Sequence, residues 1–345
     1  MFNALRSQYR FTRSVLVITF AALVLLSFAS RALAEKTEVS LAKQFGLTFF
    51  PLMVMEHLKL IEKNAQMEGR GNVTVKWVTL GGGASANEML LSGSLDFVSG
   101  GAAPLITIWS KTKGSIDVKG VASLNAMPWI LTTINPNVKT LKDFTDKDKI
   151  AMPAAKVSVH AITLQMAAAK VFGESSYEKL DRITVSMRNP DALVAMLAGK
   201  GEITSHFSGP PYPQLELQDP KVRVVLSSDD VLGGPGVLSA LYTTSKFRSE
   251  NPRLYKVVLR ALKEAQDIIN SDKRRAAELY VQLEKSKQPI DLFYQIISDS
   301  KTHFSPVPMG MMKIAEFMHK TGQIKIQPSS WKEMFFPEIH DLPGS

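Results

Sequence analysis

The sequence predicts an α/β fold built from two lobes, and three observations indicate it. Segments in which apolar and polar residues alternate take turns with helical segments, a pattern typical of a mostly parallel sheet with helices on its faces. The 345 residues are enough for two domains of about 150 residues each. A short helix–glycine–strand unit also occurs twice in the chain.

The first block of elements lies between residues 37 and 134. Strands are expected over residues 37–42, 73–77, 95–99, 119–123 and 129–134, and helices over residues 51–66, 84–91 and 102–111. The glycine triplet at 81–83 opens the second of these helices. Gly93 ends it, because glycine readily adopts the backbone conformation that closes a helix.

The second block repeats this design. Strands are expected over residues 149–152, 183–187, 203–207, 222–226 and 237–243, with helices over 160–171 and 190–198 between them. The chain is then helical to its end. Its clearest helix begins at Asn251-Pro252, a cap followed by proline in the first turn, and Ser330 with Glu333 fits a capping box for the last helix. The apolar residues of the helix after Asn251 form one stripe: Leu254, Val257, Val258, Ala261, Leu262, Ala265, Ile268 and Ile269.

The repeated unit indicates that the two lobes are related. Residues 86–97 and 192–203 align at one constant offset. In each copy a glycine, Gly93 or Gly199, stops a helix, and an acid, Asp96 or Glu202, follows before the next strand. Such a pattern also occurs in α/β proteins without duplication, and that alternative stays open. On the functional interpretation, the two lobes face each other across a cleft.

The amino terminus has the pattern of a secretory signal peptide. A basic segment with Arg6, Arg10 and Arg13 precedes an apolar run over residues 15–28, and Ala32-Leu33-Ala34 supplies a cleavage site. The run of about 14 residues is shorter than the roughly 20 that span a membrane, which makes a retained anchor the weaker interpretation. We therefore expect residues 1–34 to be cleaved off after Ala34 and the mature protein to be periplasmic.

Composition excludes several function classes. The chain has no cysteine, so its mature fold must be stabilised by its core and not by disulfide bonds. The net charge is +9, and the first 34 residues carry four arginines and no acid, which leaves +5 for the remainder. Because lysines and arginines are interspersed with acids and form no basic patch, we expect no binding to nucleic acid.

Catalytic motifs are also missing. The sequence has no cysteine nucleophile, no G-x-S-x-G elbow and no two histidines at the spacing of metal ligands. The glycine triplet lacks the spacing and the lysine of a phosphate-binding loop. We therefore predict that the protein is not an enzyme and uses no cofactor or metal.

Several short segments together carry a family resemblance. They are Gln44-Phe45-Gly46, Gly81-Gly82-Gly83-Ala84, residues 91–96, 125–129, 140–144 and 149–153 and, late in the chain, Asn251-Pro252 and residues 260–265 and 268–270. In this order and spacing they resemble the nitrate/sulfonate/taurine group of ABC-transporter substrate-binding proteins. The resemblance covers nearly the whole mature chain.

The resemblance implies a type II periplasmic-binding-protein fold, with two α/β lobes joined by two hinge crossovers near residues 125–131 and 235–242. Lobe 1 would be discontinuous and comprise residues 35–126 and 238–345, and lobe 2 would comprise residues 127–237. The implied function is that of an extracytoplasmic receptor, a monomer that closes on a small anionic ligand and delivers it to an ABC permease in the inner membrane. A sulfonate, a nitrate or a carboxylate-like molecule would be the ligand.

Two other functions stay open. A ligand-sensing subunit of a signalling system would use the same fold, which cannot separate sensing from import. An enzyme related to thiamine-pyrimidine synthesis also has a similar fold, but its cysteine-rich motif is absent here.

The candidate binding residues follow from the predicted topology. In open parallel sheets, ligands bind outside the carboxyl ends of the strands, where helix amino termini present unpaired N–H groups and a partial positive charge. An anion can bind there without lysine or arginine. The candidates are Gly83, Ala84, Ser85, Gly100, Gly101, Ser158, Val159, His160, His206, Ser208 and Gly209, together with the aromatic residues Phe45, Phe49 and Trp129. The alternatives are that the glycines form plain turns, that Ser158 only caps its helix and that the aromatic residues belong to the core.

Overall fold

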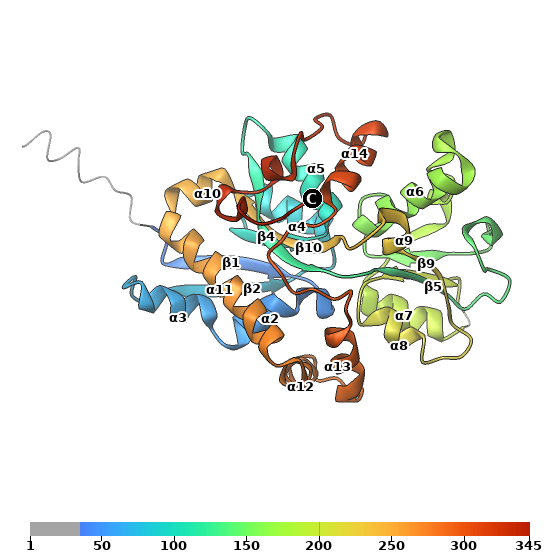
Figure 1. The fold of residues 1–345 in the computed structure, drawn as a ribbon, viewed down its shortest axis with the longest axis horizontal. Coiled ribbons are helices and arrows are strands. Elements are labelled where there is room, and N and C mark those ends of the chain that lie inside the picture. Colours follow the sequence, from blue (N-terminus) through green and yellow to red (C-terminus); the bar gives the residue numbers. More distant parts are fainter. Residues whose placement is uncertain (1–34, 200) are drawn as a thin grey trace, which may run out of the picture. The chain divides into compact units, whose positions relative to one another are not determined.

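The polypeptide forms two five-stranded sheets that are flanked by helices (Figure 1). The structure is a computed structural model, and it describes residues 35–199 and 201–345. The α/β class expected from the sequence is confirmed. The expected signal peptide, residues 1–34, lies outside the described residues. None of the described helices has the length and the apolar character that crossing a membrane requires.

The first sheet has the strand order β2-β1-β3-β10-β4. Its strands are Glu38–Lys43 (β1), Thr74–Thr79 (β2), Phe97–Gly100 (β3), Val118–Ala126 (β4) and Val237–Thr244 (β10). β1 runs parallel to β2 and β3, and Leu41 of β1 pairs with Trp77 on one side and Phe97 on the other. β10 runs antiparallel to both β3 and β4.

The second sheet has the equivalent order β7-β6-β8-β5-β9. Its strands are Ile130–Thr133 (β5), Ile150–Met152 (β6), Thr184–Ser186 (β7), Ser205–Ser208 (β8) and Arg223–Ser227 (β9). β6 is parallel to β7 and β8, whereas β5 is antiparallel to β8 and β9. In each sheet the antiparallel strand is the one that the chain forms directly after it crosses from the other sheet. The chain makes these crossings between β4 and β5 and between β9 and β10.

Helices flank both sheets. α11 packs against α2, α3 and β4, α5 packs against β4 and β10, and α7 packs against β6 and β8. The helices are Phe50–His57 (α2), Leu60–Met67 (α3), Gly83–Leu91 (α4), Ala102–Thr112 (α5), Val159–Phe172 (α6), Asn189–Leu197 (α7), Tyr212–Glu216 (α8), Ser228–Leu232 (α9), Ser245–Glu250 (α10), Pro252–Ser271 (α11), Lys273–Glu284 (α12), Ile290–Ser298 (α13) and Met311–Lys320 (α14).

The repeated unit found in the sequence occupies equivalent places in the two sheets. α4 leads into β3, and α7 leads into β8. The glycines that end the two helices have left-handed backbones, with φ of 73° at Gly93 and 63° at Gly199. Glycine adopts this conformation without the steric cost that a Cβ imposes, which explains its presence at both helix ends.

Three expectations differ from the structure. The chain is not helical throughout after β10, because residues 299–310 and 321–330 form no helix. The helix expected over residues 51–66 is two helices, α2 and α3, because Lys59 between them has a left-handed backbone with φ of 52°. The expected capping box at the last helix does not form. Ser330 caps a 3₁₀ helix, Trp331–Met334, by accepting a hydrogen bond from Lys332 N, and Glu333 Oε1 accepts one from Ser329 N instead.

α11 shows how the apolar pattern builds the core. Of the eight residues in its predicted stripe, seven are buried and Ile268 is partly buried. The stripe packs on α2 and α3, and its burial stabilises the helix against the first sheet.

We predict that Leu262→Ala lowers the free energy of unfolding by about 2–5 kcal/mol, because Leu262 is fully buried and truncation leaves a cavity. Lys256→Ala, on the exposed face of the same helix, is the control and should change it by less than about 0.5 kcal/mol. Urea unfolding measures both variants, and equal losses would show that the stripe is not the packing face.

Candidate functional site

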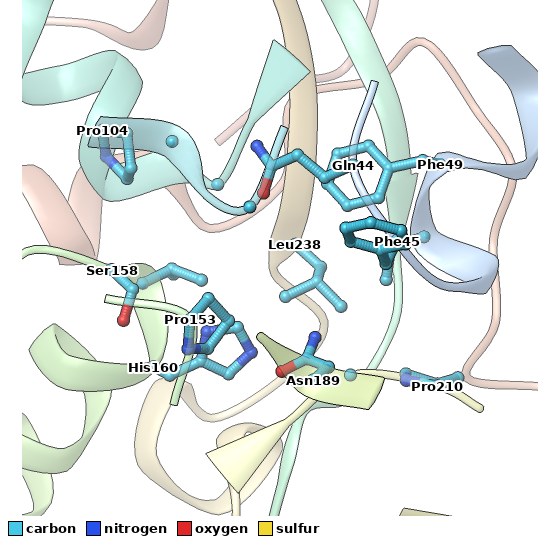
Figure 2. Close-up of a pocket in the computed structure, with 16 residues that line it drawn as sticks. Gln44, Phe45, Phe49, Pro104, Pro153, Ser158, His160, Asn189, Pro210 and Leu238 are labelled. Carbon is cyan, nitrogen blue, oxygen red and sulfur yellow. The ribbon is translucent and has the colours of Figure 1, made fainter. Parts of the chain in front are cut away.

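A pocket lies where the carboxyl ends of parallel strands from both sheets meet. Segments that follow β1, β2 and β3 line one side of it, and segments that follow β6, β7 and β8 line the other. Its cavity volume is about 50 Å³, within a larger region of about 580 Å³ that includes open solvent at the mouth. We call it the central pocket (Figure 2).

Eight of the residues expected from the sequence line the central pocket: Phe45, Phe49, Gly83, Gly101, Ser158, Val159, His160 and Gly209. They come from five separate segments that the fold brings together. The segments after β1 and before α4 and α5 face the start of α6 and the loop after β8.

Six expected residues do not line it: Ala84, Ser85, Gly100, Trp129, His206 and Ser208. Ala84 is exposed, and Ser85 Oγ donates a hydrogen bond to Gly82 O, 2.9 Å away. A side chain at Gly100 would point at the Tyr242 hydroxyl and not into the pocket.

The other three are buried behind the pocket wall. Trp129 is fully buried, and its Nε1 donates to Thr163 Oγ1 at 3.1 Å. His206 and Ser208 are also fully buried, both in β8. Trp129 therefore supports the wall from inside the core.

Eight further lining residues were not expected from the sequence: Gln44, Thr48, Gly81, Pro104, Pro153, Asn189, Pro210 and Leu238. Some of them follow a strand directly, as Gln44 follows β1 and Pro153 follows β6. Their position after a strand predicts a place at the pocket. Leu238 belongs to β10, the antiparallel strand, which enters the pocket only through the tertiary fold.

No lysine, arginine, aspartate or glutamate is among the sixteen lining residues. The guanidinium of Arg188 lies 5.8 Å from the centre of the Phe45 ring and pairs with Asp191 at 2.7 Å. Side-chain amides supply part of the polarity. Gln44 Nε2 donates to Ser99 O at 2.7 Å, which leaves its oxygen turned toward the pocket (Figure 2).

The amino terminus of α6 is an electropositive feature of the wall. Ser158 caps the helix, and its Oγ accepts a hydrogen bond from Ala161 N at 3.3 Å. The first backbone bond of the helix runs from Ile162 N to Ser158 O. Helix geometry therefore leaves the N–H groups of Val159 and His160 without an acceptor inside the helix, and the helix dipole gives this end a partial positive charge.

His160 is a buried polar side chain without a hydrogen-bond partner. It is 6% exposed, and neither ring nitrogen has a partner in the described residues. Its ring packs edge-on against Trp129 and Phe207, with centroids 6.3 and 5.6 Å away. Burial, with a smaller contribution from nearby His206, lowers the pKa of His160 to about 3. The neutral ring thus offers one donor and one acceptor at the pocket wall.

Asn189, the first residue of α7, connects the pocket to buried polar residues. Its Oδ1 lies 3.1 Å from His206 Nε2, and His206 Nδ1 lies 2.5 Å from Glu216 Oε1. Thr132 Oγ1 donates to the other carboxylate oxygen of Glu216 at 2.5 Å.

Among the described residues, no three histidine, aspartate or glutamate side chains form a group that could hold a metal ion.

No protein-family model matches the sequence, and no curated protein sequence matches it. Solved structures match by fold. The alkanesulfonate-binding protein SsuA of Xanthomonas axonopodis pv. citri, bound to MOPS, aligns over 87% of this chain and 96% of its own, with 15% identity and a TM-score of 0.67.

The periplasmic aliphatic sulphonate-binding protein SsuA of Escherichia coli aligns over 88% of this chain and 92% of its own, with 18% identity and a TM-score of 0.62. The periplasmic nitrate-binding protein NrtA of Synechocystis aligns over 89% and 84%, with 16% identity and a TM-score of 0.64. At these identities the similarity shows the fold, which is the periplasmic-binding-protein fold.

We predict that His160 makes the protein sensitive to acid. The unfolded chain binds a proton at this residue below about pH 6.5, whereas the folded protein binds it only near pH 3. Above pH 6.5 the titration of His160 therefore does not change the free energy of unfolding. As the pH falls below 6.5, it lowers that free energy. Between pH 7 and pH 5 the cost is about 2 kcal/mol.

His160→Gln removes this titration, so the stability difference between variant and wild type should shift by about 2 kcal/mol in favour of the variant over that range. Phe207→Leu, which changes packing beside the same ring without removing a titrating group, is the control. Urea unfolding at both pH values measures the shift. The same change in the free energy of unfolding between the two pH values in wild type and His160→Gln would contradict the prediction.

Proposed function

We propose that this protein is the solute-binding receptor of an ABC-type importer. The observation that carries the proposal is the central pocket, which both sheets line with the carboxyl ends of their parallel strands. Such a position is where α/β proteins bind small ligands. The fold, shared with binding proteins for sulfonates and nitrate, supports the same function.

We infer two lobes, residues 35–126 with 238–345 and residues 127–237, each built around one sheet. The crossings between β4 and β5 and between β9 and β10 act as the hinge. Between the two lobes, Leu47 N donates to Pro210 O at 3.1 Å, and Gln323 Nε2 beyond α14 donates to Gln165 Oε1 of α6 at 2.9 Å. Opening would break such contacts, so a ligand that touches both lobes favours the closed form.

The ligand carries a small oxyanion, such as a sulfonate, nitrate or carboxylate. The α6 amino terminus binds this group through the N–H groups of Val159 and His160 and the hydroxyl of Ser158. Phe45, Phe49 and Leu238 on the opposite wall accommodate an apolar portion (Figure 2). The absence of a charged side chain from the lining favours binding through dipoles and neutral hydrogen bonds.

In the cell, export with cleavage after Ala34 would place the receptor in the periplasm as a monomer that delivers its ligand to the permease. The fold does not favour import over sensing.

Catalysis is disfavoured at the pocket, because no base is hydrogen-bonded to Ser158. The ring nitrogens of neighbouring His160 have no hydrogen-bond partner.

Isothermal titration calorimetry with MOPS, methanesulfonate, nitrate and acetate tests the proposal. We predict that at least one binds and that Ser158→Ala raises its dissociation constant about ten- to a hundred-fold, since a hydrogen bond to a charged group contributes about 1.5–3 kcal/mol.

Ser158→Ala also removes a helix cap, which costs about 1 kcal/mol of stability. Thr140→Ala is the matched control, because Thr140 caps a 3₁₀ helix, Leu141–Asp143, and does not line the pocket. It should lose stability but keep its affinity. An unchanged dissociation constant in Ser158→Ala would assign this serine to the helix alone, and no binding of any probe would reject the ligand class.

A further inference from the structure

Asn189 presents a defined face of its amide to the central pocket. It is the first residue of α7 and lines the pocket between Pro153 and Pro210. Its oxygen is turned away, toward His206 Nε2 at 3.1 Å, and its nitrogen points into the pocket (Figure 2). An amide can turn over and exchange the places of its oxygen and nitrogen, so something must select this orientation.

The selecting group is a buried pair behind the pocket wall. His206 of β8 and Glu216 of α8 are both fully buried, and their side chains meet at 2.5 Å between Nδ1 and Oε1. Thr132 Oγ1 of β5 lies 2.5 Å from the other oxygen of Glu216 and 3.2 Å from His206 O. Neither His206 nor Glu216 lines the pocket.

Hydrogen-bond chemistry determines what this pair does to Asn189. His206 Nδ1 faces a carboxylate oxygen, and Nε2 faces an amide oxygen. An amide oxygen can only accept, so Nε2 donates to Asn189 whether the second proton of the pair lies on His206 Nδ1 or on Glu216. A neutral ring that donated to Glu216 would have an acceptor at Nε2, and the amide would then turn its nitrogen toward His206.

We propose that His206 and Glu216 form a positioning pair that holds the amide N–H groups of Asn189 toward the pocket, which makes Asn189 select ligands with an acceptor atom at that place. The proposal deepens the proposed function and rests on it for the ligand. The α6 terminus and Asn189 then supply donors from two sides of the pocket, and a ligand that offers a donor at Asn189 is disfavoured.

The first test needs no ligand. Nitrogen-15 spectra of the histidine rings in the ligand-free full chain are recorded near pH 7, and the His206 signals are assigned by their loss in His206→Gln. We expect a proton on His206 Nε2. An Nε2 without a proton would overturn the proposal, because it would then be an acceptor facing Asn189.

The second test uses two variants that each keep half of the contacts. His206→Gln can place a nitrogen donor near the Nε2 position beside Asn189, and His206→Asn can place one near the Nδ1 position beside Glu216. Affinity for MOPS, methanesulfonate and nitrate is measured by calorimetry, with thermal unfolding as the check on folding. We expect His206→Asn to bind at least about ten-fold more weakly than His206→Gln, although both lose stability.

Equal affinities, or tighter binding by His206→Asn, would overturn the proposal and leave the pair a structural role. Asn189→Asp adds an independent readout, because it keeps an acceptor for His206 but turns an oxygen toward the ligand. We expect about a hundred-fold loss of affinity for the anions, and retained affinity would contradict the assigned orientation.

These experiments distinguish a failure of the proposed function from a failure of the positioning pair. If wild type binds none of the probes, the anionic ligand class of the proposed function is rejected, while the nitrogen-15 spectra still decide whether His206 Nε2 carries a proton. If wild type binds and the spectra show no proton on Nε2, the receptor function stands and the positioning pair is rejected.

Discussion

The meeting of two sets of strand ends, β1 to β3 from one sheet and β6 to β8 from the other, is the constraint on which the site depends. Parallel strands place the loops after them at one edge, and each such loop leads into a helix or a 3₁₀ turn whose first N–H groups have no partner inside it. Where two such edges face each other, a cluster of donors results. The antiparallel strands β5 and β10 permit this, because each joins its sheet directly after a crossing of the chain.

The pocket obtains its polarity without charged side chains in its lining. Backbone N–H groups at α6, the neutral ring of His160 and the amides of Gln44 and Asn189 are all uncharged donors or donor–acceptors. The titratable side chains of Glu216 and His206 lie one layer back, in contact with each other and out of contact with solvent. Neutral donors held in position can bind an anion, and they release it without having to separate a strong ion pair.

Periodicity predicted the fold closely, because burial follows the spacing of apolar residues. The stripe on α11 and the paired units around Gly93 and Gly199 are examples. The break at Lys59 could not be predicted, since a lysine rarely adopts a left-handed backbone and only packing selects it. At the site, residues after strands were predictable from topology, including Ser158 and His160. Leu238 was not, because it reaches the pocket only through the crossing from the second sheet. The Asn189–His206–Glu216 contacts were not either, because the spacing of apolar residues shows burial and not which polar side chains meet.

The most direct test of the account is whether a bound ligand draws the two lobes together. Cysteines are introduced as Lys76→Cys in β2 and Lys221→Cys next to β9. Because the chain has no other cysteine, the spin labels attach only at these two positions. The distance between the labels is measured by pulsed electron resonance without ligand and with a saturating concentration of the anion that binds most tightly in calorimetry. The account predicts a broad distribution without ligand that becomes shorter and narrower with it. An identical distribution in both samples would contradict closure of the lobes around the central pocket.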